Sequence, residues 1–212
     1  MTQIKAEYVD HMGNDNSIVN AARVSFAKEA SNYTDADNNK LIAYLAKHNH
    51  WSPFTHTCIT LRCKAPIAIH AQVVKHTVGF NVNTVSRRYV SDAPEIFIPT
   101  FRTKPDGSIK QGSGDEHADN EALQKIYQEH CQKSVELYTN MIKQDVAPEQ
   151  ARFVLPQGAM TEWVWTGNVA SFARFYNQRT DFHSQVEIRV LALQVGKIIE
   201  ELYPVSWQAM TQ

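Results

Sequence analysis

Two adjacent arginines in the middle of the chain are the residues best suited to bind an anion. Arg87 and Arg88 follow Ser86 in the segment NTVSRRYV, residues 83–90, which we call the arginine strip. A guanidinium group forms forked hydrogen bonds with phosphate or carboxylate oxygens, and a neighbouring hydroxyl adds another. This composition suits an anion site, and a solvated strand edge is the alternative.

A second cationic group precedes the strip. Lys75 and His76 come before Gly79, where the backbone can adopt a positive φ or approach a ligand closely. A helix end with a lysine and a histidine, opposite a strip with a serine and two arginines, suits a multiply charged planar ligand such as a nucleotide. An ordinary polar surface loop is the alternative.

The C-terminal stretch 167–192 has polar residues at helical spacing. Asn168, Ser171 and Arg174 would share one helix face. Arg179 would end that helix, where a cation is favourable next to the negative end of the helix dipole. A solvated polar exterior and an arginine directed inward by the following turn are both compatible with this pattern.

The sequence does not favour metal or thiol chemistry. The segment HNHWSPFTH supplies His48, His50 and His56 without an adjacent carboxylate or cysteine, so hydrogen-bonded loop histidines are expected rather than a metal site. Trp51 and Phe54 in this segment suit either a core or a stacking surface for a planar ligand. The cysteines are odd in number and lack metal-ligand spacing, and a catalytic thiol is not expected at any of them: Cys58, Cys63 and Cys131.

The composition is that of an ordinary globular protein. The chain has 212 residues, of which 43% are hydrophobic and 20% are charged, so one substantial core is expected. The formal net charge of -1 provides no general attraction to nucleic acid or to an anionic membrane. No apolar run approaches the ~20 residues of a membrane span, and the first residues lack a signal peptide's apolar segment. We therefore expect a cytoplasmic location.

Apolar periodicity and turn residues predict the α+β class, with a central, mostly antiparallel sheet flanked by helices in one domain over residues 1–212. Strands are expected at 4–9, 56–65, 96–98 and 160–166. Helices are expected to open at Asp15, whose helix would carry Val24, and at Asp37, and to cover 67–75, 118–144, 169–179 and 184–202. A Gly-containing loop is expected before the arginine strip, and the polar segment 101–117 is expected to be a loop or an insertion. The long helix should bury one apolar face, formed by Leu123, Ile126, Tyr127, Leu137, Met141 and Ile142.

Several motifs in order resemble the flavin-dependent thymidylate synthases, and the resemblance extends from about residue 8 to residue 205. They are MGND at 12–15, AARVSF at 21–26, SPFTH at 52–56, KAPI at 64–67, Lys75-His76, VNTVSRRY at 82–89, ARFVLP at 151–156 and NVASFARFYNQRTDFHSQVEIR at 168–189.

The resemblance implies an enzyme that methylates C5 of dUMP to give dTMP. It implies FAD as cofactor, NADPH and 5,10-methylenetetrahydrofolate as co-substrates, and a homotetramer with active sites between subunits. No cysteine attacks the pyrimidine in that family, and the family's signature serine corresponds to Ser86, in nucleotide binding. The implied partners are small molecules, without nucleic acid or membrane.

The resemblance also assigns site residues, position by position. The catalytic residue is Arg179, whose guanidinium would contact the uracil edge and stabilise ionisation of N3. The dUMP pocket would consist of Gln72, Lys75, Ser86, Arg87, Arg88, Arg152 and Arg179. The FAD site would consist of Ser25, Ser52, Lys75, His76, Thr77, Thr84, Asn168 and Arg174.

The chain departs from the family pattern at three charged positions and in one loop length. Thr77 and Ala170 replace arginines, Thr84 replaces a glutamate, and one residue is inserted between Thr77 and Ser86. Each missing charge-assisted contact is worth ~1.5–3 kcal/mol, so FAD is expected to bind more weakly or in a shifted pose. Two alternatives therefore stand beside dUMP methylation: another pyrimidine reaction (dCMP methylation or hydroxymethylation), and a non-catalytic nucleotide- or nucleic-acid-binding homologue.

Overall fold

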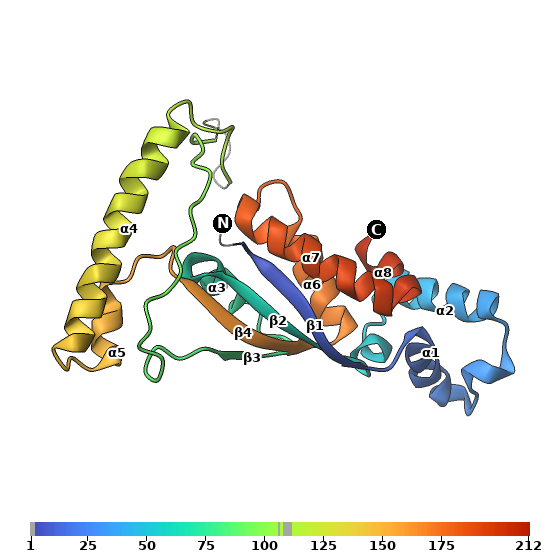
Figure 1. Ribbon diagram of the computed structural model, residues 1–212. Coiled ribbons are helices and arrows are strands. Elements are labelled where there is room, and N and C mark those ends of the chain that lie inside the picture. Colours follow the sequence, from blue (N-terminus) through green and yellow to red (C-terminus); the bar gives the residue numbers. More distant parts are fainter. Residues whose placement is uncertain (1–2, 106, 108–111) are drawn as a thin grey trace.

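The chain folds around one antiparallel sheet of four strands, in the order β1-β2-β4-β3 (Figure 1). The computed structural model describes residues 3–105, 107 and 112–212. The predicted α+β class is confirmed. The strands are β1 (Lys5–Met12), β2 (Cys58–Pro66), β3 (Phe80–Thr84) and β4 (Met160–Gly167).

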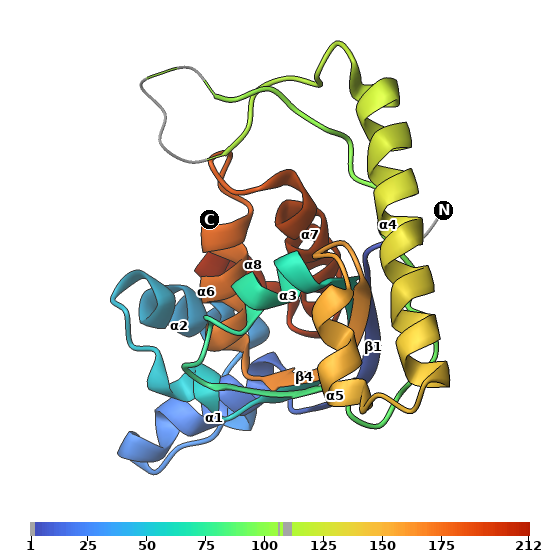
Figure 2. The ribbon, with the colours of Figure 1, turned by 90° about the vertical axis from the view of Figure 1, so that its left-hand side faces the viewer.

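Helices surround the sheet unevenly. Figures 1 and 2 show α3, α6 and α7 gathered on one side of the sheet, α1, α2 and α8 at one end, and α4 with α5 at the other. The helices are α1 (Asp15–Arg23), α2 (Asp35–Lys47), α3 (Ile67–Val73), α4 (Asn120–Lys143), α5 (Pro148–Ala151), α6 (Val169–Arg179), α7 (Val186–Leu202) and α8 (Pro204–Thr211). Single turns of 3₁₀-helix occur at η1 (Val24–Phe26), η2 (Ala30–Asn32), η3 (Ser52–Thr55) and η4 (Arg152–Val154). No helix in the described ranges is long and apolar enough to cross a membrane.

Strand alternation determines which face of the sheet the helices cover. Leu61 pairs with Trp165 and Cys63 pairs with Trp163, and all four side chains are buried. Because side chains alternate along a strand, their neighbours face the opposite side. The core therefore lies between this apolar face and helices α6 and α7.

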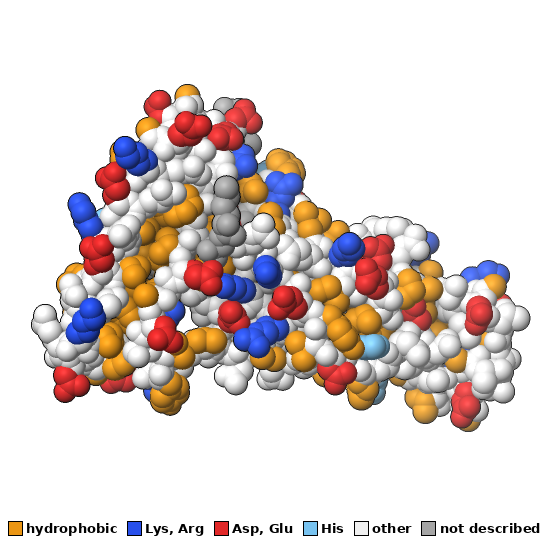
Figure 3. All heavy atoms as spheres, viewed as in Figure 1, with side chains coloured by type: hydrophobic (Ala, Val, Ile, Leu, Met, Phe, Trp, Pro, Cys, Tyr) orange, Lys and Arg blue, Asp and Glu red, His pale blue; other side chains and the backbone are white. Residues whose placement is uncertain are grey.

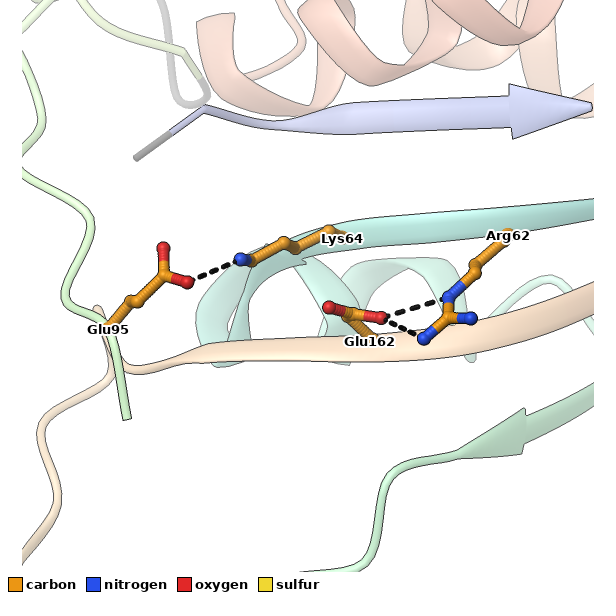
Figure 4. A network of polar contacts seen from close by, with 4 residues as sticks. All are labelled: Arg62, Lys64, Glu95 and Glu162. Atoms are coloured by element: carbon orange, nitrogen blue, oxygen red, sulfur yellow. Dashed lines mark hydrogen bonds and ion pairs between the residues drawn. The ribbon is translucent and has the colours of Figure 1, made fainter. Parts of the chain in front are cut away.

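The opposite face carries a polar network, shown in Figure 4. Arg62 of β2 donates to the carboxylate of Glu162 of β4 at 2.8 Å, and Lys64 donates to Glu95 at 2.8 Å. These pairs are solvent-exposed and screened, so they contribute little to stability. Their main effect is to keep this face of the sheet polar.

Two helices are capped by residues other than those that were predicted to open them. Asn14, not Asp15, caps α1, because its side chain accepts a hydrogen bond from the backbone of Ser17. The Asp15 carboxylate instead accepts from the backbone N–H groups of Val205 and Ser206 at the start of α8. It therefore joins the two ends of the chain, an interaction that local sequence does not reveal.

Thr34, not Asp37, caps α2, which begins at Asp35. The Asp37 carboxylate accepts from the Thr34 hydroxyl at 2.7 Å, and this hydrogen bond lowers the pKa of Asp37. Val24 also differs from the prediction: α1 ends at Arg23, and Val24 begins η1 with its side chain exposed.

The predicted strands and helix ends need four further corrections. Residues 80–84 were expected to form a loop but form β3, because Val82 pairs with Trp165 of β4. Residues 96–98 make only an isolated bridge from Ile96 to Ala159. The helix expected at 67–75 ends at Val73, and α8 was not predicted.

Helix α4 leaves part of its predicted inner face uncovered. Ile126 is 65% exposed and Leu137 is 50% exposed, so the prediction of burial is wrong for both. The covered stripe contains Cys131 and Tyr138. Figure 3 shows hydrophobic side chains gathered along α4, which stands apart from the helices over the sheet.

In the polar segment 101–117, which was predicted to be a loop or an insertion, the described residues on its two sides pair with each other. The Thr103 N–H donates to the Asp115 carbonyl at 2.9 Å, and the His117 N–H donates to the Phe101 carbonyl at 2.9 Å. Residues 106 and 108–111 lie outside the described residues.

Candidate functional site

The turn after α3 lies against α6 and brings His76 to Arg179. Arg179 is the last residue of α6, and its Nε donates to His76 Nε2 at 2.9 Å. Arg174, earlier on α6, donates to the Val78 carbonyl at 2.8 Å. Three predicted site residues from segments about a hundred positions apart are therefore in one cluster, which we call the α6 cluster (His76, Arg174 and Arg179).

The α6 cluster carries an excess of positive charge. Burial, followed by the charges of Arg179 and Arg174, lowers the pKa of His76 from 6.5 to about 4. Burial also lowers the pKa of Arg179. Neither arginine pairs with a carboxylate among the described residues. Since the ring accepts through Nε2, His76 is neutral with its hydrogen on Nδ1, and the cluster suits an anionic ligand.

Gly79 allows this close approach. Its φ is +76°, and a Cβ there would lie 2.1 Å from Ser171 Oγ and 3.0 Å from Asn168 Nδ2. Asn168 caps α6, because its side-chain oxygen accepts from the Ser171 N–H and hydroxyl at 2.9 Å each. The sequence indicated that Gly79 permits a positive φ or a close backbone approach, and the structure shows that a side chain here would collide with the start of α6.

Helix α3 positions two further polar groups. The Gln72 amide nitrogen donates to the side-chain oxygen of Gln185, the N-cap residue of α7, at 2.7 Å. The hydroxyl of Thr84, at the end of β3, lies 2.9 Å from His70 Nε2. Sequence reasoning did not identify His70, since a histidine on a short apolar helix gives no signal of its own. Lys75 and Thr77 lie exposed in the turn that follows.

The two arginines of the strip have different surroundings. Arg87 donates to the Asp92 carbonyl and so closes the loop that follows the strip. Arg88 is exposed, with its guanidinium 5.4 Å from the centre of the Tyr89 ring. Ser86 accepts the Arg88 N–H through its hydroxyl at 3.3 Å, which shapes the turn. Of the two strip arginines, Arg88 is thus the one whose guanidinium is accessible to a ligand.

Arg152 lies on η4, beside α4. Its Nε donates to the Glu149 carbonyl at 3.1 Å, and the side chain is exposed. No hydrogen bond or ion pair in the described part of the chain joins Arg152 to Ser86 or Arg88. Helix α4 contacts the strip through the Tyr138 hydroxyl, which donates to the Val90 carbonyl at 3.4 Å.

Ser25 and Ser52 lie together in another place. Both line a cavity of about 720 Å³ between α1, η1, α2 and η3. Phe26 and Trp51 also line it, and Trp51 is 63% exposed, whereas Phe54 is fully buried in the core. Of the two aromatic residues in this loop, Trp51 is therefore the one available for stacking.

Two of the three thiols are buried, and Cys58 is half-buried. Cys63 is fully buried, and burial raises its pKa, so the thiolate is disfavoured. Cys131 is also buried. Among the residues that the structure describes, no three His, Cys, Asp or Glu side chains lie close enough to hold a metal ion.

Comparison with known proteins identifies the family. Residues 7–205 match the family model described as thymidylate synthase complementing protein. The flavin-dependent thymidylate synthase of Kosmotoga olearia is 38% identical over 204 residues, which cover 95% of this chain and 87% of that protein. The enzyme of the same description from Thermosipho africanus is 36% identical over 204 residues, covering 95% and 88% of the two chains.

A solved structure supports the same assignment. The UMP/dUMP methylase PolB from Streptomyces cacaoi, bound with 5-Br dUMP, has a TM-score of 0.90 and 28% sequence identity to this chain. The match covers 99% of this chain and 95% of PolB. The resemblance found in the motifs is confirmed, and this chain belongs to the thymidylate synthase complementing protein family, whose relatives include the flavin-dependent thymidylate synthases.

Proposed function

We propose that this protein is a flavin-dependent thymidylate synthase, which converts dUMP to dTMP with 5,10-methylenetetrahydrofolate as carbon donor and NADPH as reductant. The observation that carries the proposal is the α6 cluster, in which half-buried Arg179 and neutral His76 lie with exposed Arg174, without a carboxylate partner for either arginine among the described residues. It occurs in a chain that matches the family over residues 7–205.

FAD fits the polar groups that remain despite the missing charges. The residues that would hold it are Ser25, Ser52, Lys75, His76, Asn168 and Arg174. The charges of Arg179 and Arg174, which add to the effect of burial in lowering the pKa of His76, favour the pyrophosphate. Thr77 is exposed, and we retain it as an FAD contact. The Thr84 hydroxyl already has His70 as a hydrogen-bond partner. FAD, when bound, supplies the hydride that completes the methyl group.

Arg179 is the residue that we propose acts on the pyrimidine. Its Nε is bonded to His76, which leaves the two terminal nitrogens of the guanidinium to contact the uracil edge. A cation there stabilises negative charge at N3 and raises the electron density at C5, the carbon that is methylated. We assign Arg88 and Arg152 to the phosphate, with Gln72, Lys75, Ser86 and Arg87 completing the pocket.

The proposed site residues fall into separate groups within one chain. Ser25 and Ser52 line their own cavity, and Arg152 lies beside α4, apart from hydrogen-bonded contact with the strip. The uncovered apolar residues Ile126 and Leu137 of α4 provide a surface for another subunit. We therefore propose a homotetramer in which neighbouring subunits complete each site, acting in the cytoplasm on small-molecule substrates.

The test is a spectral titration followed by turnover. The visible spectrum of the purified protein should show bound FAD, and dUMP should shift it. NADPH oxidation with folate should then be compared for dUMP, dCMP and UMP, the last because PolB is described as a UMP/dUMP methylase. Highest turnover with dUMP supports the proposal. Absence of FAD binding at micromolar concentration, even with dUMP, would favour a non-catalytic nucleotide-binding protein.

A further inference from the structure

A side-chain hydrogen bond joins the two segments that carry most of the proposed nucleotide site. His70 lies on α3, two residues before Gln72, and its Nε2 is 2.9 Å from the hydroxyl of Thr84. Thr84 ends β3, two residues before Ser86. Helix α3 follows β2 and strand β3 pairs with β4, so the side-chain bond adds a direct link between two segments that are otherwise joined only through the β2-β4-β3 ladder.

The His70 ring is fixed from a second direction. It lies edge-on against Trp163, with ring centroids 4.8 Å apart and an interplanar angle of 61°. Trp163 is 1% exposed and is the strand partner of Thr84. His70, Trp163 and Thr84 therefore form a closed triangle, in which the core tryptophan limits where both polar groups can move. Burial lowers the pKa of His70, so the ring is neutral at pH 7.5.

The bond also closes a loop of the chain. The residues between positions 70 and 84 include Gln72, Lys75 and His76, and Ser86, Arg87 and Arg88 of the strip follow directly after Thr84 and Val85. Closing a segment of this length restricts the relative positions of its two ends. The contact therefore adds a constraint on the separation between Gln72 and Ser86, on opposite sides of the proposed pocket.

We propose that His70 is a positioning residue, which through Thr84 holds the arginine strip at the distance from α3 that nucleotide binding requires. This inference rests on the proposed function. It explains one departure from the family pattern, because the short Thr84 side chain, in place of the expected glutamate, serves as the partner of His70 rather than as a ligand for the cofactor.

The experiment compares four variants of the full-length protein. Thr84→Val removes the hydroxyl and keeps the side-chain volume, His70→Ala removes the other partner, and a third variant combines both changes. Thr84→Ser retains the hydroxyl. The matched control is Thr60→Val, which removes another strand hydroxyl, one that pairs with Thr166 at 3.0 Å on β2 and β4. For each variant, the Kd for dUMP is measured together with KM, kcat and the melting temperature.

The expected result is a loss of nucleotide affinity. Losing one intramolecular hydrogen bond should raise the Kd and KM for dUMP about five- to tenfold in Thr84→Val and in His70→Ala, with kcat changed less. The double variant should bind no more weakly than the weaker single variant, because both changes remove the same bond. Thr60→Val should bind as the wild type does, and Thr84→Ser, which retains the hydroxyl, should bind dUMP more tightly than Thr84→Val.

Two outcomes would overturn the inference, and they are distinguishable. If the wild type binds dUMP but Thr84→Val binds it within twofold, even with a lowered melting temperature, the bond is structural only and the proposed function stands. If the wild type binds neither dUMP nor FAD, the proposed function fails, and the inference fails with it.

Discussion

Acid should destabilise this protein through His76. The pKa of the ring is 6.5 in a model compound and about 4 in the fold, because of burial and the charges of Arg179 and Arg174. Between these two values the unfolded chain binds a proton that the native ring does not. The free energy of unfolding therefore rises with pH across this window. The stability that depends on neutral His76 is lost progressively as the pH falls from about 6.5 to about 4.

The size of the effect follows from the two pKa values. One pKa unit corresponds to about 1.4 kcal/mol, so the fall from pH 7.5 to 5.5 should cost about 1 kcal/mol through this residue. The ring is only partly buried, which makes the full shift an upper bound. Protonation also removes the acceptor of the Arg179 hydrogen bond and places two cations 2.9 Å apart.

The assay is urea unfolding from pH 5 to pH 8 at fixed protein concentration, for the wild type and for His76→Gln. The glutamine oxygen can still accept from Arg179, but it does not titrate. The wild type should lose about 1 kcal/mol more than His76→Gln between pH 7.5 and 5.5. Equal losses in the two proteins would refute the reasoning.

The other predictions concern four separate positions. Gly79→Ala should lower the free energy of unfolding by about 2 kcal/mol, because the new Cβ meets Ser171 at a positive φ, and urea unfolding will show this. Asp15→Ala should lower it by about 1–2 kcal/mol and increase hydrogen exchange at the start of α8, whereas unchanged exchange would contradict the role of the Asp15 hydrogen bonds to Val205 and Ser206. Arg152→Ala should weaken dUMP binding about tenfold or more while FAD binding by the same protein stays within twofold, as titration will test. Cys63→Ala should retain turnover, since the thiol is buried, and loss of activity in a folded variant would contradict a mechanism without a cysteine nucleophile.

Strong apolar periodicity made the helices and central strands predictable. β2 alternates over eight residues and β4 over the five from Trp163 to Gly167, so their predicted positions were close to those observed. β3 is five residues long and contains two asparagines, which are disfavoured in strands, and it forms because β4 offers a free edge. The cap at Asn14 and the contact of Asp15 with α8 depend on backbone geometry and on a distant segment, which a local pattern cannot specify.

In the candidate site, too, the sequence predicted which residues take part, whereas their contacts depend on the tertiary structure. Family motifs identified the arginines and the signature serine, but not the partners that the fold gives them. Arg87 is engaged by the Asp92 carbonyl, and Thr84 by His70, through contacts set by the tertiary structure. The exposure of Ile126 and Leu137 could not be predicted either, since apolar residues at helical spacing look alike whether they face a core or another subunit.

The most direct test of the central claim is product identification by mass spectrometry. Purified protein would be incubated with dUMP, 5,10-methylenetetrahydrofolate, NADPH and FAD, with Arg179→Ala as the control. The account predicts dTMP that depends on FAD and is lost in the variant. Failure of the FAD-loaded wild type to form dTMP, or formation of dTMP without FAD, would contradict it.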